Sequence, residues 1–130
     1  MDSLALRLKD VNETGVYNLG CGVDELRDVA AQAGFALFEA DLAAVHGKGE
    51  FLAAIAQAVH APDWFGTNWD ALADALGDLS WCPSPGYVLL LRNGGDTLGL
   101  NDEHSIATEI LANTVAFWKL QGKAFWVFFA

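Results

Sequence analysis

Residues 87–92, YVLLLR, are the most informative stretch for the fold, because five consecutive apolar side chains precede Arg92. A short run of this kind is typical of a β-strand buried on both faces, as in a parallel sheet that is covered by helices. The C-terminal run AFWVFFA (124–130) has the same character. We therefore expect both runs to be strands of the core.

Outward from these runs, the sequence alternates between strands and helices. GVYNLG (15–20) and FALFEADL (35–42) are typical of two further strands. Apolar residues at helical spacing, with suitable caps and stops, predict helices over about 24–33, from about 48 to before Pro62, and over about 68–80. The same spacing predicts a long last helix that ends at Gly122 and contains Ile106, Ile110, Leu111, Phe117 and Trp118. In the first helix we expect Asp24 as the N-cap and Gly34 as the stop.

The predicted order is β-α-β-α-α-β-α-β. Strands that are joined by helical crossovers pair in parallel, and the helices then pack on the faces of the sheet. The fold class is therefore α/β, a layered sandwich with a small, mainly parallel sheet flanked by helices. The right-handed crossover rule restricts the strand order without fixing it.

The composition indicates one domain with a strongly acidic surface. The chain has 130 residues, of which 53% are hydrophobic, and its 17 acidic and 7 basic residues give a net charge of −10. Phosphate backbones and anionic membranes attract basic surfaces, so nucleic acid and lipid are poor partners and a basic protein is the better one. No apolar run approaches the roughly 20 residues of a membrane helix, and Asp2 occupies a position where a secretory signal favours positive charge. We expect a cytoplasmic protein.

The cysteines and histidines do not suggest a cofactor or a metal site. Cys21 and Cys82 are far apart, without a CxxC motif, which suits a reducing compartment. His46, His60 and His104 have no metal-ligand spacing, and the sequence contains no phosphate-binding glycine motif. We expect no metal and no cofactor.

The acidic helix is the segment that points to a function. No Lys or Arg occurs in the 43 residues between Lys48 and Arg92, whereas five acids do. Three of them, Asp70, Asp74 and Asp78, are spaced i, i+4, i+8, opposite an apolar side that contains Trp69, Leu72, Leu76 and Leu79. Like charges at i, i+4 disfavour a helix, so helix stability does not explain this row.

Two structural explanations compete with a functional one. Asp70 fits a capping box with Thr67, and the acidic row fits an ordinary solvated face. Against these stands the entrance to the helix, where Trp64 and Phe65 precede Gly66. Large aromatic residues beside a row of carboxylates are typical of a binding hot spot for a cationic partner.

Residues 64–76, WFGTNWDALADAL, resemble the inhibitory segment of the barstar family of ribonuclease inhibitors. The family pattern is aromatic-aromatic-Gly-x-Asn-x-Asp-Ala-Leu-x-Asp-x-Leu, and this sequence fills every restricted position. The likeness runs from about Phe35 to the C-terminus, so residues 35–130 are the barstar-like core and residues 1–34 an N-terminal strand-helix extension of one domain.

The resemblance implies an inhibitor, not an enzyme, that blocks a basic ribonuclease, either barnase-like or a toxin, with its acidic helix. Such proteins act as antitoxin or immunity proteins of bacterial type. The implied partner-binding residues are the anchor Trp64, the deepest acid Asp74, its companion Asp70, and the neighbouring Asn68, Trp69, Ala73 and Asp78.

Three positions depart from a known member of the family. Ala73 replaces a bulky aromatic residue between the two acids, Trp64 replaces a tyrosine, and alignment at Gly122 puts Phe117 where the last helix of the family contributes an acid. These differences concern the identity of the target. They leave the acidic row in place, and Asp78 adds charge to it.

Two other functions are compatible with the sequence. The first is an acidic interaction domain that binds another basic protein through the same helix. The second is a metal-dependent enzyme in which Asp70 and Asp74 hold Mg²⁺ or Ca²⁺, since hard cations favour carboxylates. No general base, nucleophile or phosphate cradle accompanies that pair of acids, which disfavours the enzyme.

Overall fold

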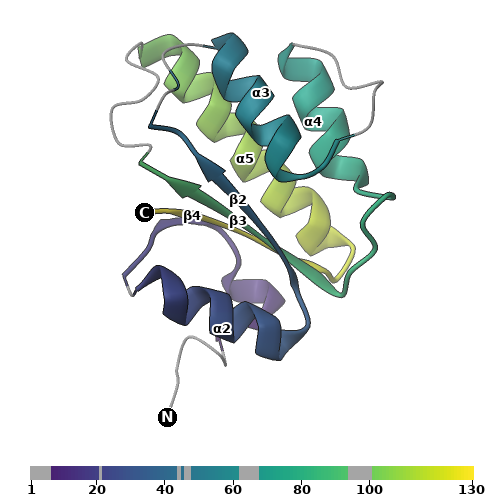
Figure 1. Ribbon diagram of the computed structural model, residues 1–130. Helices are drawn as coiled ribbons and strands as arrows, with labels where there is room; N and C mark the ends of the chain where they lie inside the picture. The colour runs from purple at the N-terminus through teal and green to yellow at the C-terminus, as the bar shows by residue number, and fades with distance from the viewer. Residues whose placement is uncertain (1–6, 21, 44, 46–47, 62–67, 94–100) are drawn as a thin grey trace.

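The computed structural model describes residues 7–20, 22–43, 45, 48–61, 68–93 and 101–130, without the side chains of Lys48 and residues 101–105 (Figure 1). The described elements are η1 (Val11–Glu13), β1 (Val16–Asn18), α2 (Val23–Ala33), β2 (Ala36–Asp41), α3 (Lys48–Ala58), α4 (Trp69–Asp78), β3 (Gly86–Arg92), α5 (Asn101–Leu120) and β4 (Ala124–Phe129). The predicted order of strands and helices is confirmed.

The four strands form one sheet in the order β1-β4-β3-β2, and every neighbouring pair is parallel. The two most apolar strands, β3 and β4, occupy its centre. In β3 the first six residues are buried, and in β4 the first five. A central strand has neighbours on both edges and helices on both faces, which explains why these segments are apolar without alternation.

The sheet divides the core into two layers (Figure 1). Leu89 of β3 and Val127 of β4 face the larger layer, which α3, α4 and α5 cover. Leu90 and Trp126 point to the other face, where α2 packs through Leu26 and its neighbours. Successive residues of a strand alternate between faces, so these two short strands supply both layers.

The N-terminal segment belongs to the same body as the rest of the chain. β1 pairs with β4, placing Val16 beside Val127. The indole N–H of the buried Trp126 donates a hydrogen bond of 2.8 Å to the carbonyl of Leu8. Without residues before Phe35, the face of the sheet that carries Trp126 would lose its cover.

The start of α2 differs from the prediction. The N-cap is Gly22, in an extended conformation and without a side-chain bond, so the assignment of this role to Asp24 is wrong. Asp24 lies in the first turn instead, where its carboxylate accepts a 2.8 Å hydrogen bond from Arg27. The predicted stop is confirmed, because Gly34 has a φ of 77°, in the left-handed region that favours glycine.

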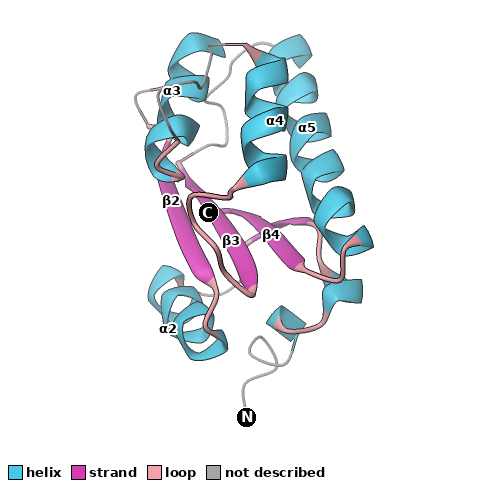
Figure 2. Ribbon diagram, turned by 90° about the vertical axis from the view of Figure 1, so that its right-hand side faces the viewer, coloured by secondary structure: helices cyan, strands magenta, loops and turns pink. Residues whose placement is uncertain are grey.

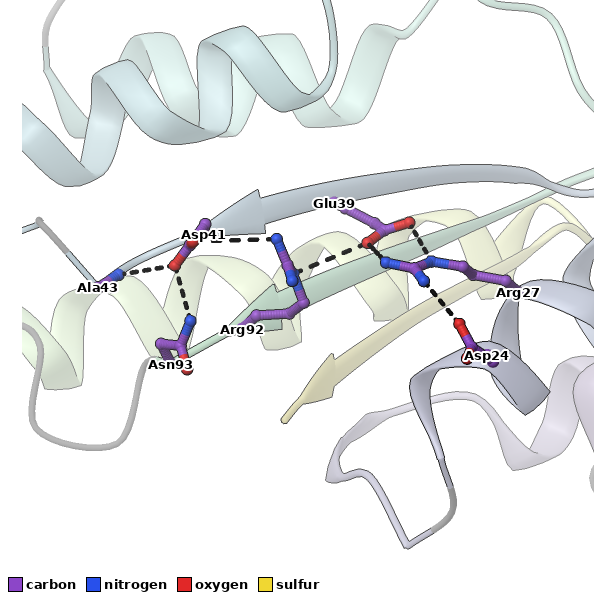
Figure 3. Close-up of polar contacts among 7 residues, drawn as sticks. All are labelled: Asp24, Arg27, Glu39, Asp41, Ala43, Arg92 and Asn93. Carbon is purple, nitrogen blue, oxygen red and sulfur yellow. Dashed lines mark hydrogen bonds and ion pairs between the residues drawn. The ribbon is translucent and has the colours of Figure 1, made fainter.

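A chain of charged side chains ties α2 to the edge of the sheet (Figure 3). Arg27 donates two hydrogen bonds, of 2.8 and 2.7 Å, to the carboxylate of Glu39 on β2. The bidentate pairing with Arg27 lowers the pKa of Glu39 below its ordinary value, and Arg92 lowers it further. At the end of β2, the amide of Asn93 donates to Asp41 over 2.8 Å and lowers the pKa of that carboxyl.

The low pKa of Glu39 predicts a stability that depends on pH. A carboxylate with a lowered folded-state pKa stabilises the protein above its unfolded-state value of 4.5, and this contribution disappears as the pH falls through the folded-state pKa. We expect Glu39→Gln to lower the urea midpoint at pH 7, and the difference from wild type to shrink as the pH falls below the unfolded-state pKa of 4.5. The exposed Glu109→Gln is the control. A difference for Glu39→Gln that does not change with pH would contradict this assignment.

Candidate functional site

The acidic helix α4 begins at a side-chain cap. Asn68 has extended backbone angles, and its Oδ1 accepts a hydrogen bond of 2.7 Å from the N–H of Ala71. A cap of this kind satisfies one of the free N–H groups in the first turn. The predicted capping box of Thr67 and Asp70 is wrong, because it needs Thr67 as the N-cap and the N-cap is Asn68. Thr67 itself lies outside the described residues.

The apolar side of α4 fixes how the helix rolls on the core. Leu72, Leu76 and Leu79 are at most 1% exposed. Trp69 is half-buried and packs on Phe51 of α3, with ring centroids 6.0 Å apart. The sequence-predicted apolar side is confirmed, and it forces the acidic side outward.

A tertiary contact closes the C-terminal end of α4. The N–H of Leu79, whose φ of 50° is left-handed, bonds to the carbonyl of Ala75. The next carbonyl, that of Leu76, accepts a 2.8 Å hydrogen bond from the indole of Trp118 on α5. The last carbonyls of a helix lack partners within the helix, so Trp118 satisfies one of them from outside.

The outer side of α4 presents the row of carboxylates to solvent. Asp70, Asp74 and Asp78 are all exposed, as is Ala73 beside them. Among the described residues, no Lys, Arg or His side chain forms an ion pair with any of the three acids. The Ser80 hydroxyl donates to Asp78 over 3.1 Å. The charge of the row is therefore available to a partner.

Residues 62–67, which precede the cap of α4, lie outside the described residues. This applies to the predicted anchor Trp64 and to Phe65 and Gly66. Their roles stay predictions from the sequence motif.

A groove with a volume of about 420 Å³ lies beside the acidic row, between α4 and α5. These two helices run side by side on the same face of the sheet (Figure 2). The groove is lined by Ala73, Asp74 and Gly77 from α4, and by Ile110, Asn113, Thr114 and Phe117 from α5. Phe117 is 46% exposed, so the structure places it at the surface next to Asp74.

The sequence did not identify four lining residues of the groove, namely Gly77, Ile110, Asn113 and Thr114. Ile110 belongs to the apolar pattern of the last helix, and that pattern does not show that this side of α5 stays partly open. One pattern in the sequence could have indicated the groove: Ala73 and Gly77 are both small and lie one turn apart on α4.

Residues 35–130 match a protein-family model described as Barstar (barnase inhibitor). The chain belongs to the barstar family. The four-stranded parallel sheet with its flanking helices is the α/β fold that this family membership predicts. No curated protein matches this barstar-family chain.

The described part of the barstar-family chain contains no group of three or more His, Cys, Asp or Glu side chains that could hold a metal ion. None of its helices combines the length and the apolar character that crossing a membrane requires.

The bond between Trp118 and α4 can be tested by Trp118→Phe. The change leaves the carbonyl of Leu76 without its partner, which costs about 1–3 kcal/mol of unfolding free energy, with a further loss from the smaller ring. We expect faster hydrogen exchange in the last turn of α4. The matched control is Trp126→Phe, which removes a similar bond on the opposite face of the sheet. If both variants gave the same exchange in α4, Trp118 would not hold the end of this helix.

Proposed function

We propose that this protein inhibits a basic ribonuclease by inserting α4 into the active site of the enzyme. It acts by binding and performs no catalysis of its own. The observation that carries the proposal is the exposed row of Asp70, Asp74 and Asp78, which forms no ion pair within the described residues, on a helix fixed at both ends in a chain of the barstar family.

The chemistry of a ribonuclease site supports this role for the acids. Such a site holds phosphate with Arg, Lys and His, and carboxylates can take the phosphate positions and accept charge-assisted hydrogen bonds. Because caps and core packing already fix α4, little conformational entropy is lost from the helix on binding. The net charge of −10 also steers a cationic partner towards the protein.

We assign roles to single residues by the family motif and their positions. Asp74 is the acid that reaches deepest, and Asp70 is its companion. The Oδ1 atom of Asn68 caps the helix, which leaves its NH₂ group for the partner. Trp69 supports the site mainly from the core side, since its ring packs on Phe51. Trp64 is the proposed aromatic anchor.

Two residues also favour a second candidate, an interaction domain for a different basic protein. Ala73 and Phe117 replace a bulky aromatic residue and an acid of a known family member, and both are exposed beside Asp74. Under either function the partner is a basic protein. For the inhibitor we propose a cytoplasmic, bacterial-type role as an antitoxin or immunity protein.

Titration against a barnase-like or toxin ribonuclease tests the inhibitor. We expect one-to-one inhibition and an association rate that falls as salt rises, because exposed charges are screened. Asp74→Ala should weaken binding by about 2–5 kcal/mol, which corresponds to roughly a thirty-fold to several thousand-fold loss of affinity. This range is typical of removing one partner of a desolvated charge pair, and the barnase–barstar complex is itself one of the systems from which it comes. The melting temperature should stay the same or rise, since repulsion from Asp70 and Asp78 is relieved.

The matched control for this titration is Asp28→Ala, which removes the same charge from the exposed side of α2. It should lower the association rate slightly and leave the dissociation rate unchanged. If Asp74→Ala bound as tightly as the parent, or unfolded, its carboxylate would be structural. If no ribonuclease in a panel were inhibited, the generic interaction domain would be the better function.

Phe117→Glu tests the position where a known family member has an acid. Phe117 is 46% exposed, so the fold should tolerate the change. We expect tighter binding to barnase, by up to about fivefold, as is typical of an added exposed ion pair. Phe117→Gln is the control, because it removes the ring without adding charge. Equal affinities of the Glu and Gln variants, measured by stopped-flow kinetics at low salt, would place residue 117 outside the interface.

A further inference from the structure

The groove between α4 and α5 has an apolar wall that is open to solvent. On α5, Ile106 and Phe117 are 38% and 46% exposed, and Ile110 lies between them at helical spacing on the same side. Among the described residues only four large hydrophobic side chains are this exposed, and two of them lie along this one side of α5. An exposed apolar strip of this kind is typical of a binding surface.

The opposite wall is built from small residues. Ala73 is exposed, and Gly77 has no side chain, so the ring of Phe117 lies in ordinary van der Waals range, 3.7 Å, of the place that a Cβ of residue 77 would take. The hydroxyl of Thr114 donates to the carbonyl of Ile110 over 2.9 Å, so it is already engaged within α5. The volume of about 420 Å³ is large enough for any single side chain.

Negative charge lines one rim of the groove. Among the described residues, Asp74 is the only charged side chain that lines the groove, while Asp70 and Asp78 extend the negative rim along α4. A cation of the partner would pair with the carboxylates at this rim, whereas the side chains of Phe117 and Ile110 offer apolar surface on the α5 wall. An apolar side chain inside the groove would contact Phe117 and Ile110, while cations of the same partner would pair with the carboxylates at the rim.

We infer that the groove takes one large apolar side chain, aromatic or branched aliphatic, from the basic partner, whose neighbouring Arg or Lys residues pair with Asp74 and Asp70. This inference rests on the proposed function in so far as the acidic row faces a basic protein. It adds a criterion for the target protein, which must carry an exposed apolar residue next to its cationic site. Ala73 and Phe117 are then the residues that determine specificity.

Three capped tripeptides, Arg-Trp-Arg, Arg-Leu-Arg and Arg-Gly-Arg, test the groove on the full chain. They have equal charge and differ only in the central side chain. By two-dimensional NMR we expect the Trp and Leu peptides to shift the amides of Gly77, Asn113 and Phe117, and to bind about tenfold more tightly than the Gly peptide, as burial of a large apolar side chain implies. Asp74→Ala should weaken all three peptides alike.

Variants of the residues that line the groove test whether the preference for the Trp and Leu peptides arises there. Ala73→Trp fills the groove, and Phe117→Ala removes its apolar wall, so each should abolish the advantage of the Trp and Leu peptides. Ala112→Trp is the matched control, since Ala112 is exposed on the side of α5 away from the groove. Equal binding of the three peptides, binding of none, or shifts away from these residues would overturn the inference.

The peptide experiment is independent of the inhibition assay. A peptide preference without inhibition of any ribonuclease would leave the groove as a site for another basic protein, and would remove only the proposed function. Inhibition without a peptide preference would remove only the groove. Where a ribonuclease is inhibited, Ala73→Trp should weaken its binding about tenfold or more, and Ala112→Trp should not.

Discussion

The indole of Trp118 connects the three parts on which the site depends. Its ring packs against Tyr87 of the central strand, with centroids 5.4 Å apart, and its N–H bonds to the carbonyl of Leu76 at the end of α4. One side chain of α5 thus links the end of α4 both to α5 and to the sheet. It helps to hold the two helices that form the groove, while the buried leucines of α4 turn the acidic row outward.

The acidic row destabilises α4, and burial of the apolar side of the helix more than compensates for this loss. Asp70, Asp74 and Asp78 repel one another by a few tenths of a kcal/mol for each i, i+4 pair, and Asp78 lies at the unfavourable end of the helix dipole. Burial of Leu72 and Leu76 contributes about 1.5–3 kcal/mol for each side chain, which is several times larger. Packing therefore allows this helix to carry charges that do not stabilise it.

Two of the three departures from a known family member, those at residues 73 and 117, lie at one place in the structure. Ala73 and Phe117 are distant in sequence, yet they line the same groove beside Asp74. A smaller residue on one wall and an apolar one on the other convert a charged surface into an apolar recess with a negative rim. The family membership and the acidic row point to a basic partner, and this recess points to what distinguishes that partner.

The sequence by itself determined the order of the elements, the buried character of residues 87–91 and 124–128, and the apolar and acidic sides of α4, because local periodicity and composition carry this information. Only the tertiary structure decided the strand order β1-β4-β3-β2, the cap at Asn68 and the groove that Phe117 shares with Ala73. These features arise from crossovers and from side chains far apart in the chain, or, at the cap, from a choice between neighbouring polar residues. No local pattern encodes the strand order or the groove, because their free energy depends on which surfaces meet once the helices have packed on the sheet.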